Sequence, residues 1–410
     1  MKINTTNIES FSFNTLEFFQ NPYPFYEEMR SINPIYKSTL LKYQGWYITG
    51  YEETVKVLKD SRFHSRPPIP AFSRNYENLR RIQENMMLFT NPQHHRRLRS
   101  LVTKFFTPNI INECHPFIEK TVDELIDQVI CRGTMEVVSD FAFPLASSVI
   151  AKILGVPVKD RPLFKEWTAS FIQSIDFMRS PKTLGNSRKV TEEIIAYFKK
   201  IIKAREQAPK EDLISKLIQE KQREEKLSYD ELIATCVLLL IAGHETTVNL
   251  ISSSIFLLIQ NPRQLEKLQD DSKLITTALE EFLRFESPAQ LIARTASEDI
   301  TVNEAVIRKG EQVYLFLGAA NRDSRKFRSP HQLDITRNPN PHLAFGHSSH
   351  FCLGSSLARL EAKIAIERLL QKVRNLQAVD GNGHYRKIIG FKSLVELHVT
   401  FDSFPDENFI

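Results

Sequence analysis

One apolar segment near the middle of the chain constrains the fold more than any other feature. Apolar residues follow a helical period from Ser228 to the pair Asn261 and Pro262, which is roughly 33 residues or about 50 Å at the rise of an α-helix. Ser228 and Glu231 have the spacing of a capping box at its start, and Pro262 ends it. A helix that is so long and so apolar is expected to be the buried axis of a compact domain.

Helical periodicity also dominates the chain on either side of this segment. It extends from about residue 92 to residue 283 and breaks at Pro108, Pro144, Pro157 and Pro181. A further helix is expected at residues 51–60, and the proline-rich residues 62–76 are expected to form a loop. Strand-like segments are short and lie near the ends of the chain, at residues 45–50, 300–307, 312–317 and 394–401.

No glycine-rich linker, repeat or low-complexity tract divides the sequence, so residues 1–410 are expected to form a single domain that is mainly α with small β-sheets. The 54 basic residues exceed the 49 acidic ones by only five, which does not favour a nucleic-acid partner. Four cysteines without a CxxC pair indicate neither a disulfide framework nor a zinc site, and suggest a reducing compartment.

The sequence also predicts a cytoplasmic protein without a membrane anchor. The first residues lack the basic start and apolar core of a signal peptide. The longest apolar run, at residues 232–243, is about a dozen residues long, short of the roughly 18 that span a bilayer.

The segment from Phe345 to Gly354 carries the strongest chemical signal. It is followed by a helical run at residues 355–370, so Cys352 lies at a loop-to-helix junction. There the free N–H groups and the helix dipole are expected to favour a thiolate over a thiol. The flanking glycines let the backbone approach a large flat group, and Phe345 can cover the sulfur. The other three cysteines are interpreted as inert packing residues: Cys114, Cys131 and Cys236.

Residues 345–354 resemble the haem-binding loop of the cytochromes P-450, the haem-thiolate monooxygenases, and the likeness to their soluble bacterial members extends over nearly the whole chain. This resemblance implies a single-domain cytochrome P-450 fold in which the long central helix lies over a buried haem b (iron protoporphyrin IX). It also implies that Cys352 binds the iron and that Phe345 and Gly354 contact the cofactor. One departure is Ser348, where the family usually has glycine, so a strained turn is expected.

Residues 242–247 of the long helix carry a second motif, Ala-Gly-His-Glu-Thr-Thr. Ala242 and Thr246 share one face, and small residues leave a groove there; alternatively, Ala-Gly only permits close helix packing and the threonines are satisfied core residues. The resemblance implies that Ala242 contacts the cofactor, that Thr246 donates a hydrogen bond to dioxygen, and that Glu245 relays protons. His244 is expected to be a packing or cavity residue.

Glu281 and Arg284 form an ExxR pair on a predicted helix. Side chains at this spacing are often a solvated surface pair, but the apolar neighbours favour burial here. The resemblance implies a structural pair that is joined by a basic residue before the cysteine loop, for which Arg337 is the candidate.

His95 and Arg99 lie four residues apart on one face of a helix that follows Pro92. The resemblance implies that they bind the haem propionates together with Arg294 and His350, since buried carboxylates need cationic partners. Within the same cluster, Arg96 and Arg97 are expected to be solvated.

The electron donor is expected to be a separate protein, because the chain has no GxGxxG fingerprint for a flavin or nicotinamide. The resemblance implies a ferredoxin or flavodoxin with its reductase. Five cations are expected to form a basic patch for that donor on the cysteine side: Arg96, Arg97, Lys104, Arg359 and Lys363.

The resemblance implies a monooxygenase that inserts one oxygen atom from dioxygen into a small apolar organic substrate, by hydroxylation or epoxidation. Two alternatives are a peroxide-driven peroxygenase and a haem-binding sensor or carrier without turnover. The acid-alcohol pair Glu245 and Thr246 argues against the peroxygenase, which needs no relay for dioxygen. The substrate cavity is expected to be lined by residues 67–89, 164–177, 241–242, 291–292 and 388–389.

Overall fold

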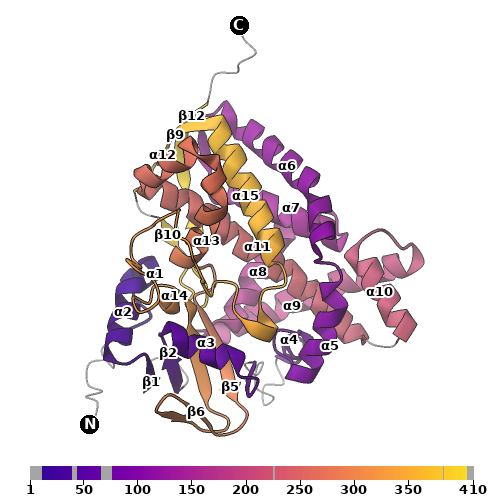
Figure 1. Cartoon of the computed structure of the whole chain (residues 1–410). Helices are drawn as coiled ribbons and strands as arrows, with labels where there is room; N and C mark the ends of the chain where they lie inside the picture. The colour runs from indigo at the N-terminus through magenta and orange to yellow at the C-terminus, as the bar shows by residue number, and fades with distance from the viewer. Residues whose placement is uncertain (1–11, 39–43, 66–75, 225–226, 382, 404–410) are drawn as a thin grey trace.

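Helices occupy most of the chain in the computed structural model, and the strands gather on one side (Figure 1). The structure describes residues 12–38, 44–65, 76–224, 227–381 and 383–403. A mainly α architecture with small β-sheets, as the sequence predicts, is therefore confirmed.

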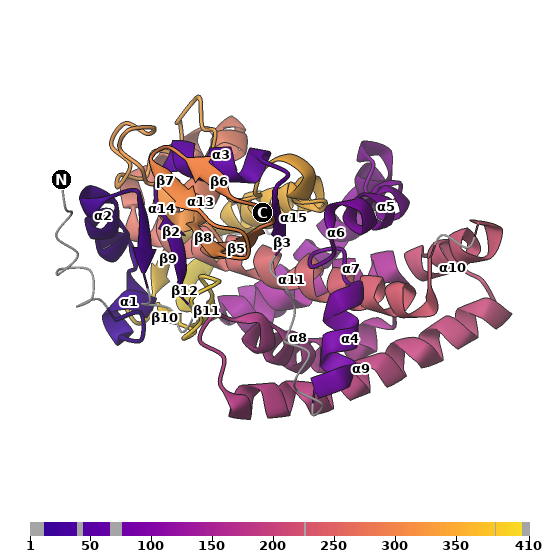
Figure 2. The ribbon, with the colours of Figure 1, turned by 90° about the horizontal axis from the view of Figure 1, so that it is seen from below.

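The long central helix is α11, Tyr229–Gln260. The Ser228 side chain accepts a hydrogen bond from the backbone N–H of Glu231, and the Glu231 carboxylate accepts one from the N–H of Ser228. Both halves of the predicted capping box are thus present, and the predicted bounds are confirmed. Viewed from below, α11 runs between the strand-rich side and the helical side (Figure 2).

The helices that surround α11 begin where the sequence places prolines. Pro108 and Pro181 are the first residues of α6 (Pro108–Ile130) and α9 (Pro181–Gln207), and Pro144 is the second residue of α7 (Phe143–Leu154). Proline fits the first turn because the N–H that it lacks would have no helical partner there. Helices α7, α4 (Glu77–Asn85) and α15 (Ser355–Lys372) pack directly on α11.

Five strands form the main sheet in the order β1-β2-β8-β5-β3, where only β2 and β8 are parallel. Their bounds are Ile35–Ser38, Gly45–Ile48, Gln312–Phe316, Leu291–Ala296 and Phe63–Ser65 in that order. The prediction of a loop over residues 62–76 is wrong at Phe63–Ser65, which form β3, where Phe63 pairs with Ala296 at the sheet edge. Residues 66–75 lie outside the described part of the chain.

The remaining helices and strands complete the described part of the chain. The helices are α1 Leu16–Gln20, α2 Tyr23–Ile32, α3 Tyr51–Lys59, α5 Pro92–Thr103, α8 Arg161–Ile175, α10 Leu213–Glu224, α12 Pro262–Asp270, α13 Ile275–Phe285 and α14 Leu317–Ala320. The strands are β4 Thr134–Glu136, β6 Ile300–Val302, β7 Ala305–Ile307, β9 Val373–Ala378, β10 His384–Tyr385, β11 Leu394–Glu396 and β12 His398–Ser403.

Two stretches are, by length and composition, apolar enough to cross a bilayer: Val137–Leu154 and α11. The expectation that no apolar run reaches the length of a membrane span is therefore wrong, because both stretches continue past polar residues that had marked their expected ends. In the fold, 67% and 83% of the most apolar 18-residue windows of these two stretches are buried inside the protein, which is typical of core helices.

Candidate active site

A cavity of about 310 Å³ lies between α11 and the loop that precedes α15. Its walls come from segments that are far apart in the sequence, including α5, β5, α11 and residues 344–354. Every predicted cofactor-contacting residue lines it: His95, Arg99, Ala242, Arg294, Phe345, His350, Cys352 and Gly354. Thr246 lines it as well, whereas Glu245 does not.

The loop before α15 presents Cys352 to this cavity. The backbone N–H of Cys352 donates to the carbonyl of Phe345 at 2.9 Å, which closes the loop on itself. Gly354 is the N-cap of α15, and a Cβ built on it would meet no atom within 4 Å. The backbone beside the sulfur is therefore open toward the cavity, as the approach of a large flat group requires.

Ser348 adopts the left-handed conformation with a φ of 57°, and Gly346 in the same loop has a φ of 71°. The strain expected for a serine at this glycine position is thereby confirmed. A hydrogen bond of 2.8 Å joins Ser348 Oγ to Nδ1 of His347.

Burial raises the pKa of the Cys352 thiol, although the Gly354 N–H, Arg99 and Arg359 act in the opposite direction. The N–H of Gly354 at the helix start therefore favours the thiolate, as expected, while desolvation of the sulfur opposes it. A metal ion on the sulfur would supply the missing stabilisation, because a coordinated thiol is deprotonated.

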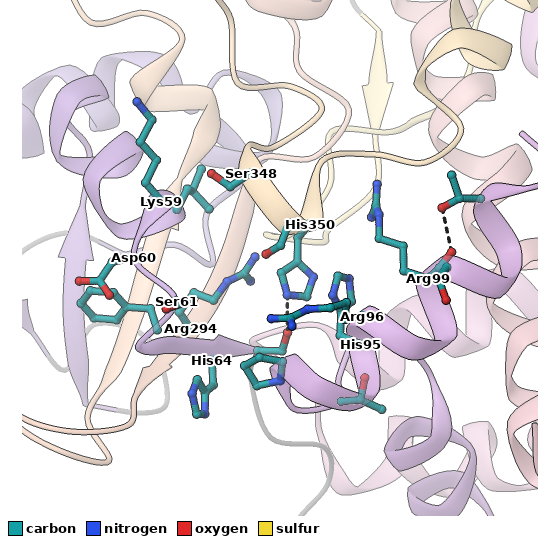
Figure 3. A pocket seen from close by; sticks show the side chains of 18 of the residues that line it. Lys59, Asp60, Ser61, His64, His95, Arg96, Arg99, Arg294, Ser348 and His350 are labelled. Carbon is teal, nitrogen blue, oxygen red and sulfur yellow. Dashed lines mark hydrogen bonds between the residues drawn. The ribbon is translucent and has the colours of Figure 1, made fainter. Parts of the chain in front are cut away.

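Four nitrogen-bearing side chains from three elements line both this cavity and a second pocket: His95 and Arg99 of α5, Arg294 of β5 and His350. Figure 3 shows them in the second pocket. The rings of His95 and His350 have centroids 4.0 Å apart. Arg99 donates to the Phe351 carbonyl at 2.6 Å, and Arg294 donates to the Ala293 carbonyl at 2.9 Å.

None of these four side chains forms an ion pair with a carboxylate of the described residues, and Asp60, which lines the second pocket with them, pairs with Arg62. Burial, with the nearby Arg99 and Arg294, lowers the pKa of His95 to about 4. Burial and the same cations lower the pKa of His350 to about 3, and burial lowers the pKa of Arg294 to about 10. Such depression marks cationic groups that are packed together without an acid, so a bound dianion would stabilise them.

The site therefore fits haem on two independent observations. The cysteine loop places a sulfur beside open backbone. The four nitrogen-bearing side chains line the same cavity and would pair with the propionate groups of haem. Of the described carboxylates, only that of Glu361 belongs to a residue that lines this cavity. Glu361 lies on α15, whereas the four-residue cluster belongs to α5, β5 and the cysteine loop.

On α11, Ala242 is exposed to the cavity although its helix is otherwise buried. The Thr246 hydroxyl donates back to the Ala242 carbonyl at 3.2 Å. A Cβ on Gly243 would lie 2.6 Å from the Ile150 side chain of α7. The motif thus has both of the meanings considered from sequence: Gly243 permits close helix packing, and Ala242 with Thr246 opens a groove.

Glu245 points away from the cavity and pairs with Arg386 at 2.7 Å. The Glu245 side chain is 9% exposed and that of Arg386 is 22% exposed, so the pair connects the helix to the surface. His244 is fully buried, and its Nδ1 lies 2.6 Å from the Leu240 carbonyl. His244 is therefore a packing residue, as expected.

The ExxR pair is buried, and its predicted third member is confirmed. Both Glu281 and Arg284 are 0% exposed, and two bonds of 2.8 Å join them. Arg337 Nε donates to Glu281 at 3.0 Å, from the irregular segment that leads to the cysteine loop.

The basic patch for the electron donor stays a prediction, and four of its five cations have an acidic partner in the structure. Such pairing reduces their long-range attraction for an acidic protein. The pairs are Arg97 with Glu231, Lys104 with Glu220 at 3.0 Å, Arg359 with Glu280 at 2.6 Å and Lys363 with Glu367 at 4.0 Å. Arg96 is exposed, as expected, and the Arg97 side chain is 34% exposed while it pairs with Glu231.

The predicted substrate lining is confirmed only in part. Met87, Leu88, Ala242 and Ile292 line the cavity. None of the described residues from 164–177 or 388–389 does, because Phe164, Trp167 and Phe171 of α8 pack in the core, where α8 contacts α9.

Sequence reasoning missed several lining residues. Leu238, Leu239 and Leu250 of α11 belong to a segment that is apolar all round, so periodicity could not select the open face. Glu361 had a usable signal, because it falls four residues after the buried Leu357 on the inward stripe of α15. Arg386 gave none, since it reaches Glu245 across 141 positions of sequence.

Comparisons with known proteins agree with this geometry. The family model described as "Cytochrome P450" matches residues 10–380. The biotin biosynthesis cytochrome P450 of Bacillus subtilis is 54% identical over 386 residues, which cover 94% of this chain and 98% of that protein. The vitamin D(3) 25-hydroxylase of Pseudonocardia autotrophica is 36% identical over 373 residues, or 90% of each chain.

Two solved structures show the same fold. P450BioI in complex with hexadec-9Z-enoic acid ligated acyl carrier protein has a TM-score of 0.91 and 54% identity, covering 94% of this chain and 99% of that one. The myxobacterial cytochrome P450 CYP267B1 in complex with myristic acid has a TM-score of 0.87 and 35% identity, covering 95% and 98%.

Family membership brings haem b as the cofactor and a monooxygenase reaction, in which one oxygen atom of dioxygen enters an apolar organic substrate and electrons come from a redox partner. The haem-thiolate loop, the cationic cluster and the matches over nearly the whole length lead to one conclusion: the chain belongs to the cytochrome P450 family.

Proposed function

We propose that this enzyme is a cytoplasmic monooxygenase that oxidises a long fatty acyl chain presented on an acyl carrier protein. The observation that carries the proposal is the 54% identity over 94% of the chain to a relative whose structure holds such a carrier with its acyl group. The lining of the cavity supports it, since Leu238, Leu239 and Ile292 offer the apolar surface that an alkyl chain prefers.

The cofactor roles that we propose follow the cavity walls. Cys352 is the iron ligand, and Phe345, Gly354 and Ala242 shape the walls against the cofactor. The propionates are held by the four-residue cluster of His95, Arg99, Arg294 and His350. Bound haem supplies the iron at which dioxygen is reduced and split.

The protein's own contribution to the chemistry is proton delivery and the exclusion of water. Thr246 lines the cavity, and its hydroxyl can give up its hydrogen bond to the Ala242 carbonyl and donate to a ligand in the groove instead. In our proposal, Glu245 relays protons from the surface, toward which its pair with the partly exposed Arg386 extends. Apolar side chains around the groove keep bulk water from the reacting carbon.

The electron donor that we propose is a ferredoxin or flavodoxin with its reductase. The lack of a flavin or nicotinamide fingerprint in the sequence supports a separate donor. We also propose that residues 1–410 act as one domain, since the cavity takes walls from α5, α11, β5 and the cysteine loop together.

The test is a Soret titration of the haem-loaded enzyme with hexadec-9Z-enoyl acyl carrier protein. Free hexadec-9Z-enoic acid and the unloaded carrier are the two controls. We expect the acylated carrier to shift the Soret band at the lowest concentration and to be oxidised when a surrogate redox chain is added. Equal or tighter binding of the free acid would contradict the carrier, and a lack of shift with both would contradict the acyl chain.

A further inference from the structure

The ion pair of Glu280 and Arg359 lies beside the cysteine loop, and the function proposed above does not use it. Glu280 belongs to α13, and Arg359 lies in α15, seven positions after Cys352. Arg359 donates from Nε to one carboxylate oxygen at 2.6 Å and from a terminal nitrogen to the other at 2.8 Å. A two-point contact of this kind holds the guanidinium in one orientation.

His342 holds the same carboxylate from the segment that leads into the cysteine loop. Its Nδ1 accepts the backbone N–H of Ala344 at 3.2 Å, so the ring proton is on Nε2, which lies 3.0 Å from Glu280. Burial raises the pKa of Glu280, but the hydrogen bonds from Arg359 and His342 outweigh it and lower that pKa to about 2. The carboxylate is therefore ionised at neutral pH and fixed from two sides.

Arg359 also contacts the cysteine loop itself. Its guanidinium lies over the ring of Phe345, 4.4 Å from the ring centroid, which is an attractive contact for a cation. The carbonyl of Phe345 accepts the N–H of Cys352 at 2.9 Å. Of the two members of the pair, Arg359 is the one whose charge acts on the Cys352 sulfur. The pair therefore has its positive end toward the sulfur.

The other cation that acts on this sulfur has a different place in the site. Arg99 lines the cavity and belongs to the four-residue cluster that we propose to hold the propionates. Arg359 does not line the cavity. The carboxylates of the cofactor therefore leave the charge of Arg359 unpaired, and Glu280 is its partner in the described part of the chain.

A fixed cation beside the sulfur favours electron transfer to the cofactor. Each electron that the redox partner delivers adds one negative charge to the iron and its sulfur ligand, and no bond breaks in that step. A nearby positive charge stabilises the reduced form more than the oxidised form. Charges and hydrogen bonds around the ligand atoms are known to set the potentials of iron centres in proteins.

We propose that the pair of Glu280 and Arg359 sets the reduction potential of the haem iron in this enzyme. The charge of Arg359 raises the potential. Glu280 is a positioning residue that fixes the guanidinium over Phe345 and offsets part of its charge. The inference rests on haem bound through Cys352 and not on the acyl substrate.

The test is a redox titration of the haem-loaded enzyme with dithionite and dye mediators, in the absence of substrate and donor protein. The variant is Arg359→Leu, and the matched control is Arg368→Leu. Arg368 lies on the same helix, farther from Cys352, and its pair with Glu119 has a similar distance of 2.6 Å and similar exposure. Both variants lose one partly exposed ion pair, so their urea midpoints should fall alike.

The potentials should differ between the two variants. We expect Arg359→Leu to lower the ratio of reduced to oxidised haem at a fixed potential about tenfold, which is about 59 mV for a one-electron couple. Arg368→Leu should change that ratio less than about twofold, because salt screens a distant charge. Arg359→Lys keeps the charge and should stay near the wild type. Glu280→Gln keeps an acceptor for Arg359 but removes the negative charge, so it should shift the ratio in the opposite direction.

An unchanged potential in Arg359→Leu, an equal shift in Arg368→Leu, or a lower potential in Glu280→Gln would overturn the proposal. If Arg359→Leu binds haem poorly, Arg359→Gln gives the same comparison with a polar side chain. The reduced carbon-monoxide spectrum of each variant shows whether the thiolate is still bound. A failed acyl carrier titration would leave the potentials unaffected, so the two proposals fail separately.

Discussion

Replacing Glu281 by glutamine should destabilise the protein more than any other single polar substitution near the cysteine loop. The Glu281 carboxylate accepts five hydrogen bonds: two from Arg284 at 2.8 Å, and one each from Asp334 N at 3.0 Å, Arg337 Nε at 3.0 Å and Asn340 Nδ2 at 3.1 Å. Three of these donors belong to the segment at residues 334–340 that leads into the cysteine loop. The carboxylate therefore joins α13 to the haem side of the molecule.

The expected loss follows from the charge that is left behind. Arg284 is 0% exposed, so Glu281→Gln leaves its guanidinium buried without a counter-ion. Breaking such a pair costs about 3–5 kcal/mol, a large part of the roughly 5–15 kcal/mol that stabilises a typical protein. The matched control is Glu280→Gln, because Glu280 pairs with Arg359 and His342 but its side chain is 27% exposed. We expect about 1–2 kcal/mol there.

Urea denaturation followed by circular dichroism, with the Soret band recorded in parallel, measures both losses. Glu281→Gln should show a lower midpoint and a weaker Soret band per protein than Glu280→Gln. Equal midpoints for the two variants would refute the assignment of a structural anchor to Glu281.

Three further outcomes follow from the site. Thr246→Ala should retain haem but divert electrons to peroxide or water, so product per electron supplied should fall; unchanged coupling would contradict its proton role. His350→Asn should flatten the pH dependence of urea stability in the cofactor-free protein. The pKa of His350 is about 3 in the folded protein and about 6.5 in the unfolded one. The contribution of His350 to the wild-type free energy of unfolding is therefore at its full value above about pH 6.5 and declines as the pH falls. Parallel pH curves for wild type and variant would count against this. Ser348→Gly should raise the free energy of unfolding by about 0.5–1 kcal/mol, since glycine removes the left-handed strain at some entropic cost; a loss would show that the serine is required.

Much of the fold is readable in the sequence where local chemistry decides it. The capping box at Ser228 and the prolines at 108, 144 and 181 set helix starts through backbone geometry, which depends only on neighbouring residues. Arg337 was also predictable, but through the resemblance to a family and not through its spacing.

The rest depends on contacts that no local pattern encodes. Strand β3 forms inside a segment expected to be a loop because Phe63–Ser65 completes a sheet edge. Glu245 turns outward because Arg386, far along the chain, offers a charge. Cations of the predicted basic patch pair with glutamates on other helices, such as Glu231 and Glu280. Tertiary pairing decides each of these cases.

The most direct test of the account is the spectrum of the reduced carbon-monoxide complex. Cys352 is the central claim, because its sulfur lines the cavity opposite α11 and beside the four-residue cluster. The account predicts the red-shifted Soret band of a haem thiolate, and its loss in Cys352→Ser. A wild-type spectrum typical of a histidine-ligated haem, or an unchanged red-shifted band in Cys352→Ser, would contradict it.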